Sequence, residues 1–259
     1  TGFRPVRTIH MSFVPDEEIG GGDGMQILLE SNWYKTKNIG LALDEGLASE
    51  DDYYTVFYGE RLPWWIKIKA DGNTGHASRF IEDTAVASVI DVVNRALKFR
   101  EEQKNKLHHD HDKCVEACSH SVAKKLGDVT SLNVTLLKAG MQAGGKDVLN
   151  VVPASAEAGF DIRISPHQPC EEIESILNEW CDEVNAKNGS CQVTWRHENF
   201  ALSTHHTTDL SDENPWWKLF RETLYNQCDI CCRTEVFPAA TDSRFIRALG
   251  VKAFGFSPM

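Results

Sequence analysis

Apolar residues recur along the chain at two spacings, and the change from one spacing to the other marks the predicted elements. Alternation of apolar and polar residues is typical of a strand with one buried face, whereas recurrence at every third or fourth position is typical of an amphipathic helix. Alternation over residues 6–14 predicts a strand, the short run at 25–29 predicts a helix, and the compact run at 39–43 predicts a second strand. This order predicts a βαβ unit with parallel strands.

Acidic side chains follow both predicted strands of this unit. Asp16, Glu17 and Glu18 come after the first strand, and Asp44 and Glu45 end the second. A right-handed crossover brings the carboxyl ends of two parallel strands to one edge of a sheet, where ligands bind in open sheets. Neighbouring carboxylates repel unless a cation or proton is near, so the pattern favours a metal site. The alternative is a solvated, negatively charged helix N-terminus, which the same residues suit equally well.

A second domain is predicted in the middle of the chain. Alternation at residues 64–70, 129–137 and 156–164 predicts strands, and helical spacing at 84–100 and 173–184 predicts helices. The order of strand, helix, strand, strand, helix and strand is typical of an α+β sandwich. The first of these helices carries one apolar side, which consists of Val86, Val89, Ile90, Val93 and Leu97.

The last part of the chain is expected to rejoin the first domain. Asn214-Pro215 predicts the start of a helix, and residues 253–256 predict a final buried strand. The predicted fold class is therefore α/β, with a parallel sheet in a domain formed by residues 1–59 and 196–259 and interrupted by an α+β sandwich domain at 60–195.

The charge and composition of the chain disfavour two classes of partner, nucleic acids and membranes. The net charge is −11, with 27 Lys and Arg against 38 Asp and Glu, and no basic stripe suggests binding to nucleic acid. No apolar run approaches the roughly 20 residues that a membrane helix needs. The first 14 residues lack the layout of a signal peptide, and the eight cysteines are not spaced like a disulfide framework. These features predict a cytoplasmic protein with no nucleic-acid or membrane partner and with reduced thiols.

Three further features carry candidate chemistry. His76 lies in a glycine-rich loop, where it is either an exposed turn residue or a polarising donor or ligand. Arg163 lies on an alternating strand, where it is either paired with a neighbouring side chain or available to clamp a substrate carboxylate. Residues 108–120 combine His and Cys at zinc-like spacing, but no predicted strand or turn fixes them, which disfavours a metal site there.

Several motifs together resemble those of the dinuclear-zinc amidohydrolases, a family of aminoacylases, carboxypeptidase G-type enzymes, dipeptidases and acylornithine deacetylases. They are Arg-Thr-Ile-His-Met-Ser-Phe-Val-Pro-Asp-Glu-Glu at 7–18, Ala-Leu-Asp-Glu-Gly at 42–46, Gly-His-Ala-Ser-Arg-Phe at 75–80, Asn-Val-Val-Pro-Ala at 150–154, Phe-Asp-Ile-Arg at 160–163, Asn-Pro-Trp-Trp at 214–217, Pro-Ala-Ala-Thr-Asp at 238–242 and Gly-Phe-Ser-Pro-Met at 255–259. They occur in the order of the family and span nearly the whole chain.

The resemblance implies a catalytic zinc domain interrupted by a lid domain that also forms a homodimer. It implies that Glu17 is the general base, that Glu18 and Glu45 are zinc ligands, and that His76 reaches the active site of the partner subunit. Asn150 and Arg163 match lid positions that contact the substrate, and the partner of Arg163 is expected to be the α-carboxylate.

The implied reaction is hydrolysis of an N-acyl-L-amino acid to a carboxylate and a free amino acid. Two zinc ions would lower the pKa of a bridging water, Glu17 would take its proton, and zinc with His76 would stabilise the oxyanion. A related dipeptidase or deacetylase on the same scaffold is the alternative.

The ends of the chain and the lid depart from the family pattern. The chain begins at Thr1 and ends at Met259, and the resemblance places further metal ligands beyond both ends. We therefore expect a fragment that is inactive alone, and a non-catalytic dimerising protein remains a second hypothesis. Residues 103–127 form an insertion in the predicted lid.

Overall fold

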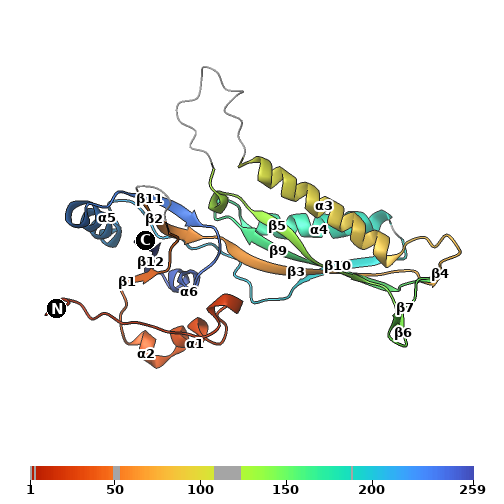
Figure 1. The fold of residues 1–259 in the computed structure, drawn as a ribbon, viewed down its shortest axis with the longest axis horizontal. Helices are drawn as coiled ribbons and strands as arrows, with labels where there is room; N and C mark the ends of the chain where they lie inside the picture. Colours follow the sequence, from red (N-terminus) through yellow and green to blue (C-terminus); the bar gives the residue numbers. More distant parts are fainter. Residues whose placement is uncertain (1, 3, 49–52, 108–123, 188) are drawn as a thin grey trace, which may run out of the picture.

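The computed structural model describes residues 2, 4–48, 53–107, 124–187 and 189–259, and it is elongated, with one four-stranded sheet toward each end (Figure 1). The first sheet has the order β1-β12-β2-β11, and the second has the order β10-β3-β9-β5. The bounds of the first-sheet strands are Leu41–Asp44 for β1, Tyr54–Glu60 for β2, Cys232–Phe237 for β11 and Lys252–Phe256 for β12.

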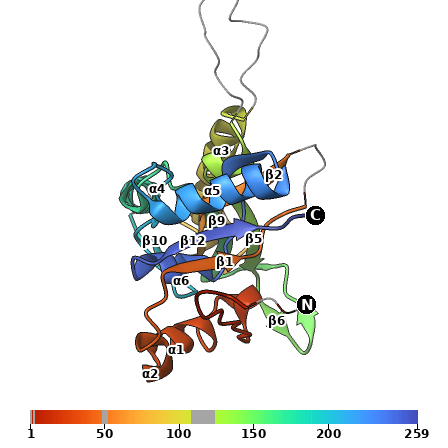
Figure 2. The same ribbon diagram turned by 90° about the vertical axis from the view of Figure 1, so that its left-hand side faces the viewer.

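The first sheet is mixed and is built from both ends of the chain. β1 pairs with β12 in parallel, β11 pairs with β2 in parallel, and β12 pairs with β2 in the antiparallel direction. Helices α5 and α6 lie on opposite faces of this sheet, and α1 and α2 lie beyond α6 (Figure 2). The helices are α1 (Met25–Glu30), α2 (Asn32–Lys35), α5 (Pro215–Cys228) and α6 (Ser243–Ala248). The last part of the chain therefore does rejoin the first.

The strand predicted at residues 6–14 is wrong, and with it the predicted βαβ unit. This segment has no strand partner in the described chain, and its apolar side chains are exposed, with Phe13 at 87%. Alternation marks a face that can be buried, but a strand also needs a neighbour whose backbone groups complete its hydrogen bonds. The helix at 25–29 and the strand at 39–43 are confirmed as α1 and β1, and β1 takes β12 as its parallel neighbour.

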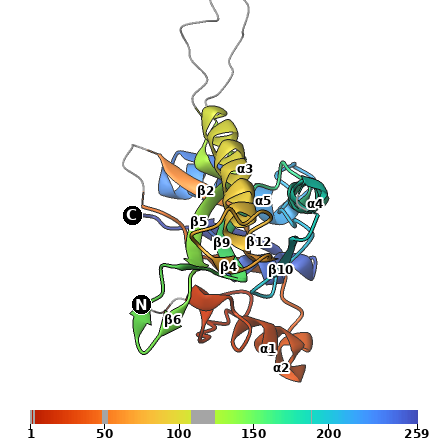
Figure 3. The same cartoon turned by 90° about the vertical axis from the view of Figure 1, so that its right-hand side faces the viewer.

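The second sheet follows the predicted order of elements, and all of its neighbouring strands are antiparallel. The view from that end of the molecule shows helices α3 and α4 covering the same face of the sheet (Figure 3). Thr84 caps α3 by accepting a hydrogen bond from the backbone N–H of Ala87. The elements are β3 (Leu62–Asp71), α3 (Ala85–Asn105), β5 (Ser131–Ala139), β9 (Ser155–Ile164), α4 (Cys170–Lys187) and β10 (Gln192–His197).

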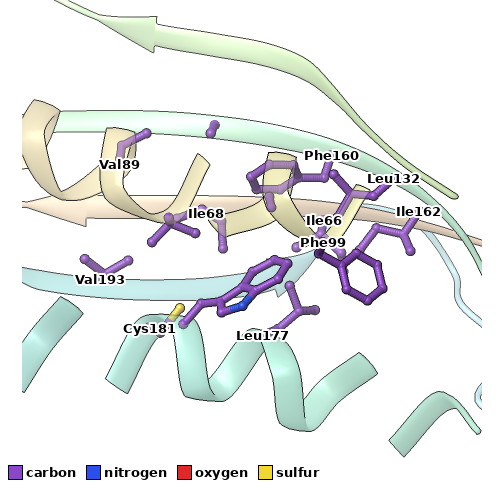
Figure 4. Close-up of a cluster of buried hydrophobic side chains, with 14 of the residues drawn as sticks. Ile66, Ile68, Val89, Phe99, Leu132, Phe160, Ile162, Leu177, Cys181 and Val193 are labelled. Carbon is purple, nitrogen blue, oxygen red and sulfur yellow. The ribbon is translucent and has the colours of Figure 1, made fainter. Parts of the chain in front are cut away.

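A large apolar core lies between this sheet and its helices (Figure 4). Alternate side chains of β3, such as Ile66 and Ile68, point into it and meet Phe160 of β9 and Leu177 of α4. Each fully buried side chain of this size contributes about 1.5–3 kcal/mol relative to an exposed one. The opposite face of the sheet is uncovered and carries charged pairs such as Lys67 with Glu198, which are 3.0 Å apart.

Two small two-stranded sheets extend the second sheet away from the first. β4 (Gly75–His76) pairs with β8 (Val151–Val152), and β6 (Gln142–Ala143) pairs with β7 (Lys146–Asp147). A short 3₁₀ helix, η3 (Leu126–Asp128), contacts β11 of the first sheet. In the described part of the chain, no helix is both long and apolar enough to cross a membrane.

The chain passes directly from the first sheet to the second, because Glu60 ends β2 and Leu62 begins β3. Arg61, which lies between them, is buried and donates from Nε to the carbonyl oxygen of Pro238 at 2.7 Å and from Nη1 to Ser131 Oγ at 2.8 Å. One side chain thus ties both sheets together. The domain boundaries at 60 and 195 stay a prediction.

Candidate active site

The acidic residues at 16–18 lie in a tightly closed loop. Asp16 adopts a left-handed conformation with φ of 63°, and its Oδ2 accepts a hydrogen bond from the backbone N–H of Asp23 at 2.7 Å. A Cβ on Gly24 would lie 2.1 Å from the carbonyl oxygen of Pro15, so only glycine fits where the loop closes. The loop leads into the 3₁₀ turn η1 (Glu17–Ile19), which presents Glu17 and Glu18.

Asp44 and Glu45, the acidic pair at the end of β1, differ in what their side chains contact. Asp44 Oδ2 accepts hydrogen bonds from the backbone N–H and the hydroxyl of Ser243, at 3.0 and 2.8 Å. Its other oxygen accepts the backbone N–H of Glu45 at 2.9 Å. Asp44 therefore fixes the start of α6 against β1, whereas the side chain of Glu45 is exposed.

The two acidic segments are electrostatically coupled. Burial, together with the carboxylates of Glu45, Asp242 and Glu18, raises the pKa of Glu17 to about 7, and Arg244 opposes the rise. Burial also raises the pKa of Glu45, with Glu18 among the charges that add to the rise. Glu17, Glu18 and Glu45 thus influence one another electrostatically. Their convergence in one metal site stays a prediction, and the βαβ unit behind that prediction is wrong.

Asp242 and Arg244 belong to the same site and were not predicted to act in it. Burial raises the pKa of Asp242 to about 6 against the attraction of Arg244, and its buried Oδ1 has no hydrogen-bond partner in the part of the chain that the structure describes. Arg244 donates to the carbonyl oxygens of Thr241 and Gly20, at 2.6 and 3.1 Å, and so ties α6 to the acidic loop. The motif at 238–242 was the available signal, but no local pattern shows which partners it meets.

A buried ion pair stabilises the turn that carries Asp242. Arg247 Nη1 donates to Glu60 Oε1 at 2.5 Å, and the other oxygen of Glu60 accepts the backbone N–H of Thr241. Burial raises the pKa of Glu60, and Arg247 opposes the rise. The carboxylate at the end of β2 therefore holds the turn that delivers Asp242.

The cluster fits a divalent cation in its charge and in its hard oxygen donors. Carboxylates outnumber the single arginine among the groups that shift the pKa of Glu17, and Asp16 Oδ1 is a second buried oxygen with no partner. Such uncompensated oxygens are the environment that a cation relieves. Among the residues that the structure describes, however, no three His, Cys, Asp or Glu side chains lie close enough together to hold an ion. The donors present fit part of a metal shell.

A pocket of about 190 Å³ joins this cluster to the second sheet. Its charged lining residues are Glu17, Glu18, Arg163 and Arg244, and its aromatic lining residues are Trp65, Phe200 and Phe245. The volume is below the roughly 300–1,000 Å³ of pockets for drug-sized ligands, so a small ligand suits it better.

Arg163 is paired with a neighbour on its strand, as one alternative predicted, and its role toward a substrate stays a prediction. Its Nε and Nη2 donate to the two carboxylate oxygens of Asp161, at 2.6 and 2.9 Å, and Trp65 Nε1 also donates to Asp161 Oδ2 at 3.1 Å. It is therefore paired with a neighbour on the strand. It is also half-buried and lines the pocket that contains Glu17.

His76 and Asn150 lie together, but far from Glu17. The carbonyl oxygen of Asn150 accepts the backbone N–H of Ala77 at 2.9 Å, so the two residues share the β4–β8 end of the molecule. His76 is exposed, and its Nδ1 accepts the backbone N–H of Ser78 at 3.2 Å, which directs Nε2 outward. Figure 1 shows this end opposite to β1 and α6. Within one chain the structure does not bring His76 or Asn150 to the acidic cluster.

The His- and Cys-rich segment lies outside the described residues for the most part, since residues 108–123 are not among them. The cysteines that the structure describes are free; they are Cys170, Cys181, Cys191, Cys228, Cys231 and Cys232.

Comparison with known proteins gives the family. Residues 58–189 match the peptidase dimerisation domain of the M20 type. The chain belongs to the M20 family. This M20 chain is 47% identical over 262 residues to aminoacylase-1 of Dictyostelium discoideum, with 100% of the chain and 60% of that protein covered. It is 43% identical to rat aminoacylase-1A and 40% identical to human aminoacylase-1, covering 100% of the chain and 57% of each relative. The chain thus spans about three-fifths of the length of the relatives it matches.

Solved M20-like structures share the fold. Human carnosine dipeptidase 1 superposes with a TM-score of 0.59 at 13% identity, over 93% of this chain and 57% of that one. A tripeptidase from Staphylococcus aureus superposes with a TM-score of 0.56 at 18% identity, over 94% of this chain and 54% of that one. At these identities the likeness shows the fold alone. The predicted α/β class with an interrupting dimerisation domain is confirmed, although the first sheet is mixed and not purely parallel.

Proposed function

We propose that this protein is a zinc-dependent hydrolase that converts N-acyl-L-amino acids into a carboxylate and a free L-amino acid. The observation that carries the proposal is the pocket, where Glu17 and Glu18 of the acidic loop face Arg163 of the second sheet. A site that accepts an N-acyl amino acid needs a group for the α-carboxylate and a base near the amide. The identity to aminoacylases over the whole chain supports the same assignment.

Glu17 acts as the general base in this proposal. It lines the pocket and is half-buried, and its raised pKa of about 7 places a proton acceptor near neutral pH, where a general base works best. It would take the proton from the water that attacks the amide carbonyl. It would then return a proton to the leaving amine.

Glu18 and Glu45 would hold zinc, with two ions in each complete site. When bound, zinc lowers the pKa of water and polarises the substrate carbonyl. Glu18 and Glu45 come from different segments, and Asp44 fixes the end of β1 so that Glu45 stays beside the loop. In this proposal the zinc would lie between the acidic loop and the end of β1, because these two segments carry Glu18 and Glu45.

Arg163 would bind the α-carboxylate of the substrate. Asp161 holds its guanidinium by both oxygens, so the side chain is oriented before the substrate arrives. A pre-oriented guanidinium loses less conformational entropy on binding and discriminates in favour of a planar carboxylate.

A homodimer would form through the domain proposed at residues 60–195, with the two parts at 1–59 and 196–259 forming the catalytic domain. The predicted apolar side of α3 is only partly used within the chain, because Val89 is buried whereas Ile90 and Leu97 are 46% and 43% exposed. β5 is an edge strand of the second sheet. An apolar stripe beside a free strand edge suits a second copy of the chain. His76 and Asn150 would then reach the pocket of the partner, since they lie far from their own.

The test is release of free amino acid from N-acetyl-L-methionine by the protein expressed from its complete reading frame, with zinc. We expect Glu17→Gln to lower kcat by about 10²–10⁴-fold, because it removes the proton acceptor and keeps the size of the side chain. Glu157→Gln, which changes a half-buried carboxylate on the open face of the second sheet, is the matched control and should leave kcat unchanged. Equal activity of Glu17→Gln and wild type would contradict the assignment. Cleavage of dipeptides in place of N-acyl amino acids would show that the substrate class is wrong.

A further inference from the structure

The segment between β10 and α5 crosses the pocket at residues 198–202, which we call the strap. It is attached to β3 on one side by hydrogen bonds that resemble strand pairing. The backbone N–H of Glu198 donates to the carbonyl oxygen of Trp65 at 2.8 Å. Next to it, Asn199 Oδ1 accepts the backbone N–H of Trp65 at 3.0 Å, and Asn199 Nδ2 donates to the carbonyl oxygen of Pro63 at 3.1 Å. The side-chain amide of Asn199 thus replaces a peptide group of a neighbouring strand.

The far end of the strap is held as well. Trp64 Nε1 donates to the carbonyl oxygen of Leu202 at 2.8 Å, and Trp64 itself is fully buried. The side chain of Leu202 packs against the core of the second sheet and also against the cluster around Met25 and Phe245 beside the acidic loop. The backbone on both sides of the strap is therefore fixed to the two halves of the site.

Phe200 lies between these fixed points and is 65% exposed, although it lines the pocket. Exposing a large aromatic surface to water is unfavourable, and a flexible loop could turn such a ring inward. The hydrogen bonds of Asn199 and Leu202 oppose that change. The backbone that carries Phe200 is thus held at the pocket, and Phe200 lines it together with Trp65 and Phe245.

We propose that Phe200 determines which amino-acid side chains the site accepts, and that Asn199 is a positioning residue that holds Phe200 in place. This inference rests on the proposed function. The charged residues of the pocket, Glu17, Glu18 and Arg163, would engage the amide and the carboxylate of the substrate. The side chain on the substrate Cα would then meet the apolar part of the lining, whose aromatic residues are Trp65, Phe200 and Phe245, and its apolar surface leaves water when it does so.

The experiment compares kcat/KM for N-acetyl-L-methionine and N-acetyl-L-alanine in the complete protein with zinc. Phe200→Ala should lower the methionine-to-alanine ratio about tenfold, which is the scale of discrimination that small apolar groups give in a pocket. The value for the alanine substrate should stay near that of wild type. Phe200→Leu keeps an apolar side chain there and should retain most of the ratio.

Tyr225→Ala is the matched control, because Tyr225 is 66% exposed on α5 and does not line the pocket. It should leave the ratio unchanged. Asn199→Asp keeps the acceptor for Trp65 but places a carboxylate oxygen against the carbonyl of Pro63 in place of the donor. We expect Asn199→Asp to raise KM for N-acetyl-L-methionine severalfold and to leave kcat for N-acetyl-L-alanine unchanged. A general loss of folded protein would not give this pattern.

Different results would overturn the role of Phe200 and the role of Asn199. An unchanged ratio in Phe200→Ala, in a protein whose wild type hydrolyses both substrates, would overturn the role of Phe200. Equal losses for both substrates in Asn199→Asp would overturn its positioning role. Wild-type protein that hydrolyses no N-acyl amino acid would instead refute the proposed function on which the inference rests.

Discussion

The two ends of the molecule differ in what they bury. Under α3 and α4 the second sheet buries apolar side chains such as Phe160 and Leu177, in one continuous core (Figure 4). The first sheet end buries the Glu60–Arg247 ion pair beside smaller apolar clusters, and one oxygen each of Asp16 in the acidic loop and Asp242 before α6 has no hydrogen-bond partner among the described residues. Buried charge and unpaired carboxylates lower stability but supply reactive groups. The second sheet thus supports the fold by packing, and the first sheet end holds the carboxylates on which the proposed chemistry rests.

We expect the two ends to differ most in the free energy of unfolding that is lost when one carboxylate charge is removed from each. Glu60→Gln leaves Arg247 buried without a counter-charge, which should lower the free energy of unfolding by about 3–5 kcal/mol. Asp91→Asn in α3 removes partly exposed contacts to Arg95 and Lys187 and should lower it by less than about 1 kcal/mol. Urea unfolding followed by circular dichroism measures both. Similar losses for the two variants would contradict the contrast.

The next comparison concerns leucines on helices at the two ends. Leu177 of α4 is fully buried, whereas Leu219 of α5 is 58% exposed. Leu177→Ala leaves a cavity in the larger core and should lower the free energy of unfolding by about 3 kcal/mol. Leu219→Ala should change it by less than about 0.5 kcal/mol. A loss at Leu219 as large as that at Leu177 would show that the surface of the first end is packed in solution.

A further comparison concerns the pH dependence of stability where the two ends meet. His205 follows the strap, and its Nε2 lies 3.8 Å from Cys170 Sγ at the start of α4. Burial lowers the pKa of His205 from 6.5 to about 4, so the folded state binds fewer protons than the unfolded state between these values. Its contribution to stability is present above pH 6.5 and is lost as the pH falls toward 4.

His205→Gln should therefore flatten the decline of the unfolding free energy between pH 6.5 and 4, a range that follows from the pKa shift. The measurement is urea unfolding of both proteins across that range. An identical pH dependence of the variant and wild type would show that His205 is not buried in its neutral form.

The second sheet could be predicted from the sequence because its pattern and its partners agree. The alternation at 64–70 matches a strand with one face on a core, and the helical spacing at 173–184 matches a helix that covers that face. These elements pack within one local unit, so hydrophobic periodicity alone identifies them. The segment at 6–14 has the same alternation but no strand partner in the described chain, and periodicity cannot reveal a missing neighbour.

The site could be predicted only in part. The convergence of Glu17, Glu18 and Glu45 was predicted from their places after apolar runs; the three are electrostatically coupled because β1 and the acidic loop both contact α6, but their joint metal site stays a prediction. Asp242 and Arg244 were not assigned to it, because their contact with the loop depends on a helix more than 200 residues away in the chain. The roles of His76 and Asn150 stay predictions, since within one chain they lie at the opposite end.

The most direct test of the metal centre is zinc binding by the complete protein, measured by titration calorimetry. If the carboxylates after the acidic loop and β1 hold zinc, Glu45→Gln should weaken binding by at least about tenfold or remove one ion, while Glu157→Gln should bind like wild type. Unchanged affinity and stoichiometry in Glu45→Gln would contradict the placement of the metal centre at this edge of the first sheet.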